Sequence, residues 1–319
     1  MGPGCIWILF TCFLINNTLA STCGKEAKCS INRIHGMKAA DCFNQNIRMF
    51  PQCLSSDLQV LDISQNRIRK LDKKDLKRYS GLKMLYLSDN LIRLIQDEAF
   101  EGMNDLTTID LSWNAIEVVP PLIFQLPSLK TLYLGHNNIN IADTFDQIKS
   151  ISSPLSNLHL DYISEDGPVP FPSLGVVPLL TRLNISGTDF DDMTPKQFAG
   201  LCNLKTIINE NTTVEFINRC DCWRINRWLI RRRVEFKAFE CDIDGSECAM
   251  EISEEDLKTF QDCEVFAEKM TRTQKLNKGL IYAGIIAGIF VLCILVYIIY
   301  QKTNRIKPRL NQKSTVNLL

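Results

Sequence analysis

An eleven-residue pattern recurs along the middle of the chain and restricts its fold more than any other feature. LQVLDISQNRI at residues 58–68 is followed 24 residues later by LKMLYLSDNLI, and LTTIDLSWNAI and LKTLYLGHNNI begin at residues 106 and 129. Weaker copies, LSNLHLDYI and LTRLNISGTDF, begin at residues 155 and 180. The aliphatic residue at the fourth position recurs after 24, 24, 23, 26 and 25 residues, at Leu61, Leu85, Ile109, Leu132, Leu158 and Leu183. Such units must stack on one another, because one unit is too small to bury an apolar face alone.

The period and the grid L-x-x-L-x-L-x-x-N-x-L are those of a leucine-rich repeat. The short strand in each copy is expected to lie about 4.8 Å from the next, so that the strands form a parallel sheet. We therefore predict an α/β solenoid, an arc of repeats whose parallel β-sheet lines the concave face.

One polar residue keeps its place on this apolar grid. A buried amide donates and accepts hydrogen bonds at once, so stacked asparagines can pair the backbone groups that are freed where each strand ends. We interpret them as a structural ladder of Asn66, Asn90, Asn114 and Asn137. The position becomes Ile163 and then Thr188, where the regularity fails.

The convex side is predicted to carry its own apolar column. Phe100, Phe124, Phe145 and Phe198 recur behind the strands and are expected to fill the core. The segment EDGPVPFPSLGVVP, residues 165–178, contains four prolines, which exclude a helix and favour an extended loop. Two interpretations stay open: the repeat degenerates near its end, or the segment protrudes as a functional loop.

Two apolar segments lie outside the repeats. CIWILFTCFLI, residues 5–15, is too short to cross a bilayer and is typical of a secretory signal. Residues 279–300 carry no charge, and 22 helical residues reach about 33 Å, enough to span the hydrocarbon core. Basic residues after this segment predict a cytoplasmic C-terminus. The chain is thus expected in the plasma membrane as a single-pass type I protein with an extracellular N-terminus.

The cysteines agree with export. Ten remain outside the signal and the span, and they cluster at the two ends of the exported part, which predicts disulfide-bonded caps in an oxidising compartment. They are Cys23, Cys29, Cys42, Cys53, Cys202, Cys220, Cys222, Cys241, Cys248 and Cys263. The predicted organisation is a signal peptide (1–20), an N-terminal cysteine-rich cap (21–57), repeats (58–209), a C-terminal cysteine-rich cap (210–264), a juxtamembrane stalk (265–278), a transmembrane helix (279–300) and a cytoplasmic tail (301–319).

With CFNQNIRMFPQC leading into the first repeat and CDCWRINRWLI beginning at Cys220, the chain resembles extracellular leucine-rich-repeat single-pass type I membrane proteins with cysteine-rich N- and C-terminal flanking caps. In that family the C-terminal flank opens with C-x-C, which Cys220 and Cys222 match. The resemblance implies that Cys220 bonds a middle cysteine and Cys222 bonds Cys263. Whether Cys241 or Cys248 is the middle cysteine stays open, with the spare one available to pair with Cys202.

The outward positions of the strands supply a candidate ligand surface on the concave face. Aromatic side chains beside acids suit a protein interface, since they bury a large area at little entropic cost. The alternative is that a pleated sheet simply favours aromatic residues. The candidates are Tyr86, Asp89, Asp110, Trp113, Tyr133, His136, His159, Asp161 and Tyr162.

Two sequons, at Asn184 and Asn211, predict glycosylation. Asn184 stands at an outward strand position, so a glycan there would cover one end of the concave face. Ligand contact would then end around His159 and Tyr162.

Other clusters carry less weight. The neutral net charge gives no pull toward nucleic acid, and no catalytic spacing or phosphate loop is present, so we expect neither an enzyme nor a cofactor. His136, His159 and Asp161 are predicted to fall on adjacent strands, but we do not expect them to form a metal site. Arginines 224, 227, 231, 232 and 233 predict a solvated helix face, with an acidic glycan or a lipid surface as the alternative ligand.

Gly284 and Gly288 form a G-x-x-x-G face that suits a homodimer through the transmembrane helix, although membrane helices are rich in glycine anyway.

The resemblance implies a recognition protein. The favoured hypothesis is an adhesion molecule or co-receptor that binds an extracellular protein ligand or membrane co-receptor through the concave face and signals through partners. The 19-residue tail (301–319) is too short for a folded signalling domain. The alternative is an auxiliary ion-channel subunit that acts through its transmembrane helix, since the chain also resembles small gamma-type subunits of large-conductance potassium channels.

Overall fold

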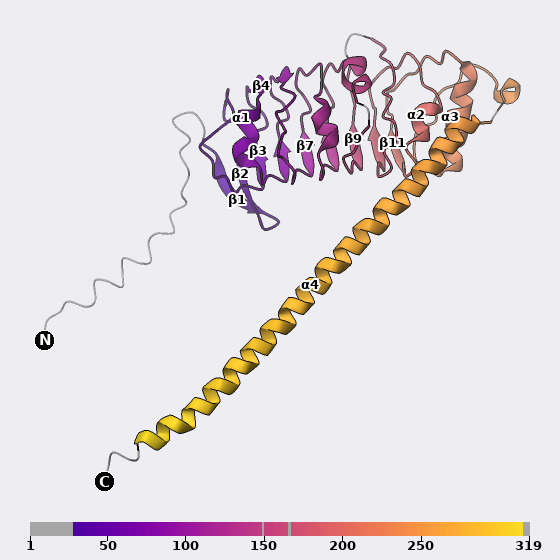
Figure 1. The fold of residues 1–319 in the computed structure, drawn as a ribbon. Helices are drawn as coiled ribbons and strands as arrows, with labels where there is room; N and C mark the ends of the chain where they lie inside the picture. Colours follow the sequence, from indigo (N-terminus) through magenta and orange to yellow (C-terminus); the bar gives the residue numbers. More distant parts are fainter. Residues whose placement is uncertain (1–27, 149, 165–166, 250, 315–319) are drawn as a thin grey trace. The chain divides into compact units, whose positions relative to one another are not determined.

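The computed structural model describes residues 28–148, 150–164, 167–249 and 251–314 (Figure 1). The predicted signal peptide, Cys23 and residues 315–319 of the predicted tail lie outside the described residues. The chain divides into two compact units, Met1–Glu264 and Val265–Leu319.

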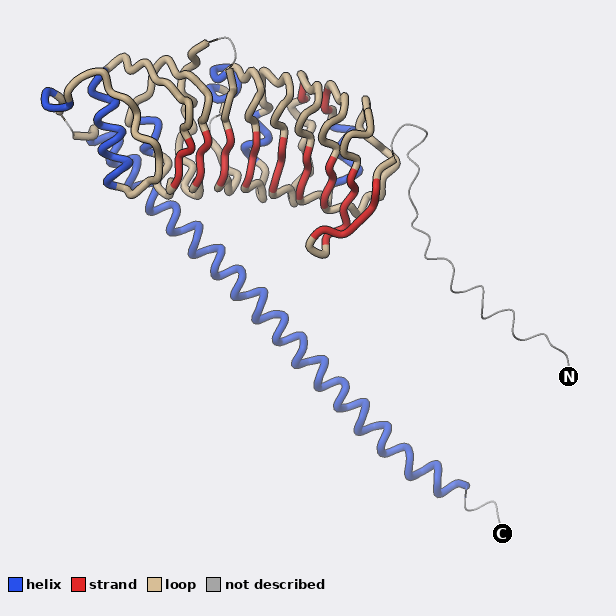
Figure 2. The backbone as a smooth tube through the Cα atoms, turned by 180° about the vertical axis from the view of Figure 1, so that it is seen from behind, coloured by secondary structure: helices blue, strands red, loops and turns tan. Residues whose placement is uncertain are grey.

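The first unit is a stack of coils, each of which contributes one short strand to a shared sheet (Figure 2). Its strands, in spatial order, are β1 (Ser30–Ile34), β2 (Met37–Asp41), β3 (Val60–Asp62), β5 (Met84–Tyr86), β7 (Thr108–Asp110), β8 (Thr131–Tyr133), β9 (Asn157–His159), β10 (Arg182–Asn184) and β11 (Thr206–Ile208). β1 and β2 form an antiparallel hairpin, and every later pair is parallel. The predicted parallel solenoid is confirmed.

The register follows the repeat grid. Leu61 pairs with Leu85, and the fourth-position residues continue pairwise through Leu158 and Leu183. β11 belongs to a seventh coil, which the six sequence copies do not include. Its Ile207 pairs with Leu183 and follows it by 24 residues. At the other end Ala40 pairs with Leu61, so β2 of the N-terminal cap continues the sheet in the same register and β1 forms its edge.

The other side of each coil carries short elements that cover the core. They are β4 (Lys70–Leu71), α1 (Lys73–Leu76), η1 (Lys77–Tyr79), β6 (Leu94–Ile95), η2 (Pro121–Gln125), η3 (Ala142–Asp146) and α2 (Lys196–Ala199). Behind them the four predicted phenylalanines are buried, and the rings of Phe124 and Phe145 lie 5.5 Å apart.

The proline-rich segment belongs to this wall. Its described residues, 167–178, contain no helix, and Phe171, Leu174 and Val177 are buried. The Phe171 ring lies 5.1 Å from that of Phe190 and 5.3 Å from that of Phe198. These contacts favour packing onto the solenoid over a protruding loop.

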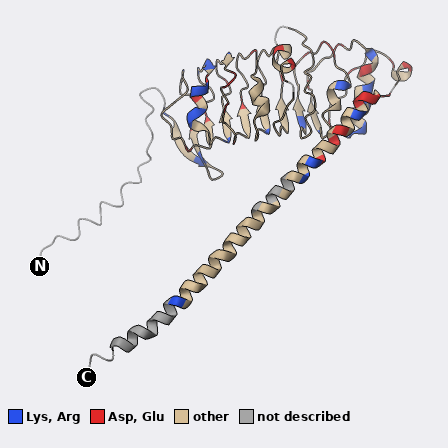
Figure 3. Ribbon diagram, in the orientation of Figure 1, with Lys and Arg blue, Asp and Glu red and all other residues tan. Residues whose placement is uncertain are grey.

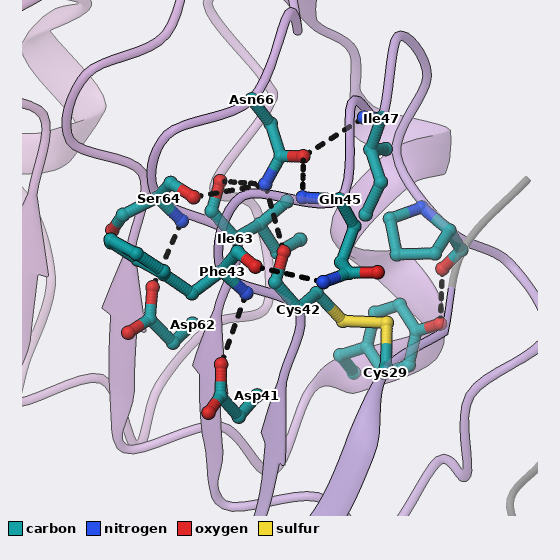
Figure 4. Close-up of a disulfide and its surroundings, with 12 residues drawn as sticks. Cys29, Asp41, Cys42, Phe43, Gln45, Ile47, Asp62, Ile63, Ser64 and Asn66 are labelled. Carbon is teal, nitrogen blue, oxygen red and sulfur yellow. Dashed lines mark hydrogen bonds between the residues drawn. A yellow bond between two sulfur atoms is a disulfide. The ribbon is translucent and has the colours of Figure 1, made fainter.

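Each asparagine of the ladder bonds two coils. Asn66 donates to Ile63 O of its own coil and to Cys42 O of the coil before it, both at 2.9 Å (Figure 4). Its Oδ1 accepts from the backbone N–H groups of Gln45 and Ile47. Asn90, Asn114 and Asn137 repeat this arrangement one coil further on each time. The amides therefore satisfy backbone groups that the strands leave unpaired.

Threonine hydroxyls continue the ladder where asparagine stops. The fully buried Thr188 accepts from Ile163 N and donates to Leu160 O, both at 3.3 Å. One coil later Thr212 donates to Ile185 O at 2.8 Å. Thr188, which occupies the asparagine position of its coil, thus keeps a hydrogen-bonded link to the neighbouring coil.

Disulfides stabilise both caps. Cys29 bonds Cys42 in the N-terminal cap (Figure 4), where Cys53 is also disulfide-bonded. The C-terminal cap contains α3 (Arg219–Arg231), η4 (Gly245–Glu247) and the start of α4 (Glu254–Ser314). Its bonds are Cys202–Cys263, Cys220–Cys248 and Cys222–Cys241.

This connectivity corrects the pairing that the family resemblance implies. Cys222 bonds Cys241 instead of Cys263, and Cys202 takes the last cysteine. Cys241 and Cys248 therefore both bond the C-x-C pair, and neither is spare. The physical reason is the position of Cys202, which follows shortly after α2. Its Cα atom lies 5.9 Å from that of Cys263, within disulfide reach.

Arg232 contacts α3, α4 and the segment that contains α2. Its guanidinium lies 5.3 Å from the Trp228 ring centre and 4.6 Å from that of Phe260, and it donates to the carbonyls of Phe198 and Leu201. Burial lowers the Arg232 pKa to about 10, and Glu264 partly opposes this effect. The five predicted surface arginines therefore do not form one face, because Arg232 packs inside and Arg224 pairs with Asp221 at 2.8 Å.

In the second unit, one stretch of α4 is long and apolar enough to cross a membrane. It covers Tyr282–Lys302 with a mean hydropathy of 2.7, and none of it is buried. This candidate span overlaps the segment predicted at 279–300 and includes Gly284, Gly288 and the exposed free thiol of Cys293.

Candidate functional site

The eighth residue of every coil has a left-handed backbone. The residues at this position, with φ between +50° and +63°, are Gln65, Asp89, Trp113, His136, Tyr162, Gly187 and Asn211. Backbone hydrogen bonds between coils hold the turn, for example Trp113 N to Gly135 O at 3.0 Å and His136 N to Asp161 O at 2.8 Å. Glycine, asparagine and aspartate adopt this conformation most easily, and larger side chains pay about 1–2 kcal/mol for it.

Three successive coils nevertheless place an aromatic ring at this position. The rings of Trp113 and His136 stack with their centres 3.6 Å apart and their planes at 12°. His136 also stacks on Tyr162, at 4.6 Å and 13°. Trp113 and Tyr162 remain 58% and 41% exposed, so the stack presents its outer surfaces to solvent.

A second aromatic pair lies on the strands beside the stack. Tyr133 of β8 and His159 of β9 are register partners, and their ring centres lie 4.4 Å apart. Tyr86 and Asp110 precede them at the same position in β5 and β7. We call Tyr86, Asp110, Trp113, Tyr133, His136, His159, Asp161 and Tyr162 the concave aromatic patch.

Two glycines make room for this patch. A Cβ on Gly187 would lie 2.1 Å from the Tyr162 ring, and a Cβ on Gly135 would lie 2.6 Å from the Asp161 carboxylate. Both glycines occupy grid positions where neighbouring coils carry larger residues. Sequence reasoning missed them, although the change of Ser88 and Ser112 to Gly135 at the seventh position was a visible signal.

Asp161 lies between the two histidines. Its Oδ2 is 3.8 Å from His136 Nε2 and its Oδ1 is 3.9 Å from His159 Nδ1. Asn184 donates to the same Oδ1 at 3.0 Å. Among the described residues no group of three or more His, Cys, Asp and Glu side chains is arranged to hold a metal ion. The Asn184 hydrogen bond fixes this carboxylate near the two imidazoles, and we interpret the cluster as a polar anchor for the aromatic rings.

Two groups in the patch have shifted pKa values. Burial lowers the pKa of His159 below 6.5, and the nearby Asp161 carboxylate acts in the opposite direction. Burial raises the pKa of Tyr86 above 10, with Tyr133 and Asp110 adding to the effect. Both rings are therefore neutral near pH 7.

We predict that the His159 ring titrates with a midpoint below 6.5 in an NMR pH titration, the signal being assigned with His159→Gln. Replacing Asp161 by Asn should lower this midpoint further, because it removes the favourable carboxylate. Since the unfolded chain takes up this proton first, the contribution of the neutral His159 to stability should decline as the pH falls below 6.5 and through the lower folded-state pKa. A midpoint at or above 6.5 would contradict the burial of this ring.

The two sequons differ in accessibility. Asn211 is exposed at the eighth position, whereas Asn184 is half-buried and bonded to Asp161. Attachment of a glycan at either residue, and a ligand boundary at Asn184, stay predictions.

Sequence comparisons agree with the repeat architecture. The leucine rich repeat family matches residues 56–116 and 106–153, which contain the first four copies. Residues 56–153 therefore consist of leucine-rich repeats.

Relatives of this chain share part of its length. Podocan-like protein 1 of Homo sapiens is 30% identical over 187 residues, covering 50% of this chain and 34% of the relative. Tsukushi of Gallus gallus is 28% identical over 188 residues, covering 56% and 49%. Toll-like receptor 2 type-2 of Gallus gallus is 24% identical over 189 residues, covering 58% and 23%. The matched part spans half or less of each relative's length.

Proposed function

We propose that this leucine-rich-repeat protein is a non-enzymatic cell-surface recognition protein that binds an extracellular protein through the concave aromatic patch. Its second unit would anchor it as a single-pass type I membrane protein. One relative is named a receptor, which supports a recognition role for this kind of repeat. The candidate span Tyr282–Lys302 and the disulfide-bonded caps support an exported position.

The observation that carries the proposal is the aromatic stack at left-handed positions. Trp113, His136 and Tyr162 do not lie in strands, so the preference of pleated sheets for aromatic residues does not explain them. Folding alone favours small or polar residues at these turns, as Asp89, Gly187 and Asn211 illustrate. Backbone strain that is retained in this way is typical of functional positions.

The chemistry of the patch favours a partner that presents a basic side chain. Aromatic faces attract guanidinium and ammonium groups. Here the Asp161 carboxylate lies near His136 and His159, and Asp110 is the register partner of Tyr86 and Tyr133. Rigid, exposed rings also lose little conformational entropy when they are buried. We expect the Trp113 and Tyr162 rings to contribute most of the affinity.

The partner can be sought by proximity labelling on intact cells that display the full-length protein. Trp113→Ala combined with Tyr162→Ala should then weaken binding of the partner at least 100-fold, the loss expected when two interface hot spots are truncated. Phe43→Ala is a matched control, because this aromatic residue is 46% exposed outside the patch. Equal binding by the double variant and the control would contradict the proposal.

A segment exchange separates this proposal from the auxiliary channel subunit. Replacing residues 279–319 by a foreign span and tail should leave ligand binding intact if the repeats carry recognition. Loss of a channel-modulating activity in that chimera, together with normal activity after the repeats are replaced, would instead support the channel alternative.

A further inference from the structure

A second surface, on the lateral wall of the N-terminal coils, concentrates positive charge. Arg67 and Arg69 flank the buried Ile68, and Leu91 and Arg93 flank the buried Ile92 one coil later. Because exposed and buried residues alternate here, the two residues that flank each isoleucine lie on the same, solvent-exposed side of their coil. Arg48, which follows the buried Ile47, occupies the coil before them. We call Arg48, Arg67, Arg69 and Arg93 the lateral arginine cluster.

Backbone hydrogen bonds fix the spacing of the cluster. Arg67 N donates to Ile47 O at 2.8 Å, Leu91 N to Ile68 O at 3.0 Å, and Arg93 N to Arg69 O at 3.0 Å. The parallel pair β4 and β6 continues this bonding with Lys70 opposite Leu94. The backbone positions that carry these arginines thus recur at the spacing of adjacent strands, about 5 Å per coil.

The cluster has no acidic partner within the described part of the chain. None of its four side chains takes part in the ion pairs found there. By contrast, the nearby Lys70 and Lys74 pair with Asp72, and Lys73 pairs with Glu101. Figure 3 shows Lys and Arg positions gathered around α1 in these coils. Glu117, at the position of Arg93 one coil later, bounds the cluster on that side.

The surface between these arginines is hollowed. Arg48, Arg67, Arg69 and Leu91 line a shallow cavity of about 340 Å³, in which Leu91 remains 45% exposed. A guanidinium binds the oxygens of a sulfate or carboxylate with two parallel hydrogen bonds. An exposed aliphatic side chain among such groups can contact the apolar face of a sugar ring.

We propose that the lateral arginine cluster binds a linear sulfated polysaccharide laid across the coils. Unpaired arginines on successive coils match a polymer with repeating anionic groups better than a single small anion. The inference takes from the proposed function only that the repeats lie outside the cell. It does not depend on the protein partner of the concave aromatic patch.

The test uses the full-length protein in nonionic detergent, with heparin as the probe. Arg67→Gln, Arg69→Gln and Arg93→Gln together should weaken heparin binding at least 10-fold at 0.15 M NaCl. The slope of log Kd against log salt should fall by about two to three, since fewer counterions are released. The matched control removes three exposed arginines from the C-terminal cap, Arg227, Arg231 and Arg233, and should bind heparin as the unaltered protein does.

Three further measurements complete the test. Desulfated heparin should bind at least 10-fold more weakly than heparin, and polyglutamate should not compete with it. The triple variant should keep its melting temperature because its side chains are exposed; if it melts lower, Arg48→Gln tests the same hollow with one change and should weaken binding about threefold. Unchanged heparin binding, an equal loss in the control, or equal competition by polyglutamate would overturn the proposal.

Discussion

Replacing Asn90 by Leu should lower the free energy of unfolding of the repeats by about 3–5 kcal/mol. Asn90 is only 7% exposed, donates to Ile63 O at 3.0 Å and Leu87 O at 3.1 Å, and accepts from Ile68 N at 3.1 Å. Leucine has nearly the same shape, so the loss would come from unpaired backbone groups and not from a cavity. Thermal unfolding followed by circular dichroism should show a decrease of about 10 °C.

The control for this experiment is Asn104→Leu, which changes an exposed asparagine in a turn. It should shift the melting temperature by no more than about 2 °C. A small effect of Asn90→Leu would mean that water or a local rearrangement satisfies the freed groups. The ladder would then not be needed for stability.

Removing the Cys202–Cys263 disulfide should cost about 4 kcal/mol. The bond closes a loop with a sequence separation of 61 residues, and the entropic gain from cross-linking the unfolded chain grows with loop length. The double variant Cys202→Ala and Cys263→Ala avoids a new free thiol and should melt about 10 °C lower. Cys293→Ala, which removes the exposed free thiol in the candidate span, should leave the melting temperature of the repeats unchanged.

Disulfide mapping by mass spectrometry under non-reducing conditions tests the same arrangement chemically. We expect peptides joined through Cys202–Cys263, Cys220–Cys248 and Cys222–Cys241. A peptide that joins Cys222 to Cys263 would restore the pairing implied by the family resemblance. That pairing would also mean that Cys202 and Cys263 do not bond each other, so the double variant would have no reason to melt about 10 °C lower.

The candidate site was only partly predictable. The grid placed Trp113, His136 and Tyr162 in one outward column, but their stacking depends on the left-handed backbone and on the space beside Gly187. The approach of His136 to Asp161 likewise depends on side chains of adjacent coils, which lie 25 residues apart in the sequence.

The lateral arginine cluster shows the same limit. Arg48, Arg67, Arg69 and Arg93 are scattered among other charges in the sequence, and nothing in their spacing separates them from Lys70, Lys73 and Lys74. Only the three-dimensional arrangement shows which cations are neutralised by Asp72 and Glu101 and which remain unpaired.

The repeat pattern alone predicts the stacked coil, its register and the polar ladder, because a repeat of nearly constant length must place equivalent residues side by side. Tertiary structure decided what periodicity does not encode: the exchange of disulfide partners around Cys263, the burial of Arg232 between Trp228 and Phe260, and the continuation of the ladder by Thr188. Each of these depends on contacts between residues that are distant in the chain. Their free energy arises only once the coils have closed around the core.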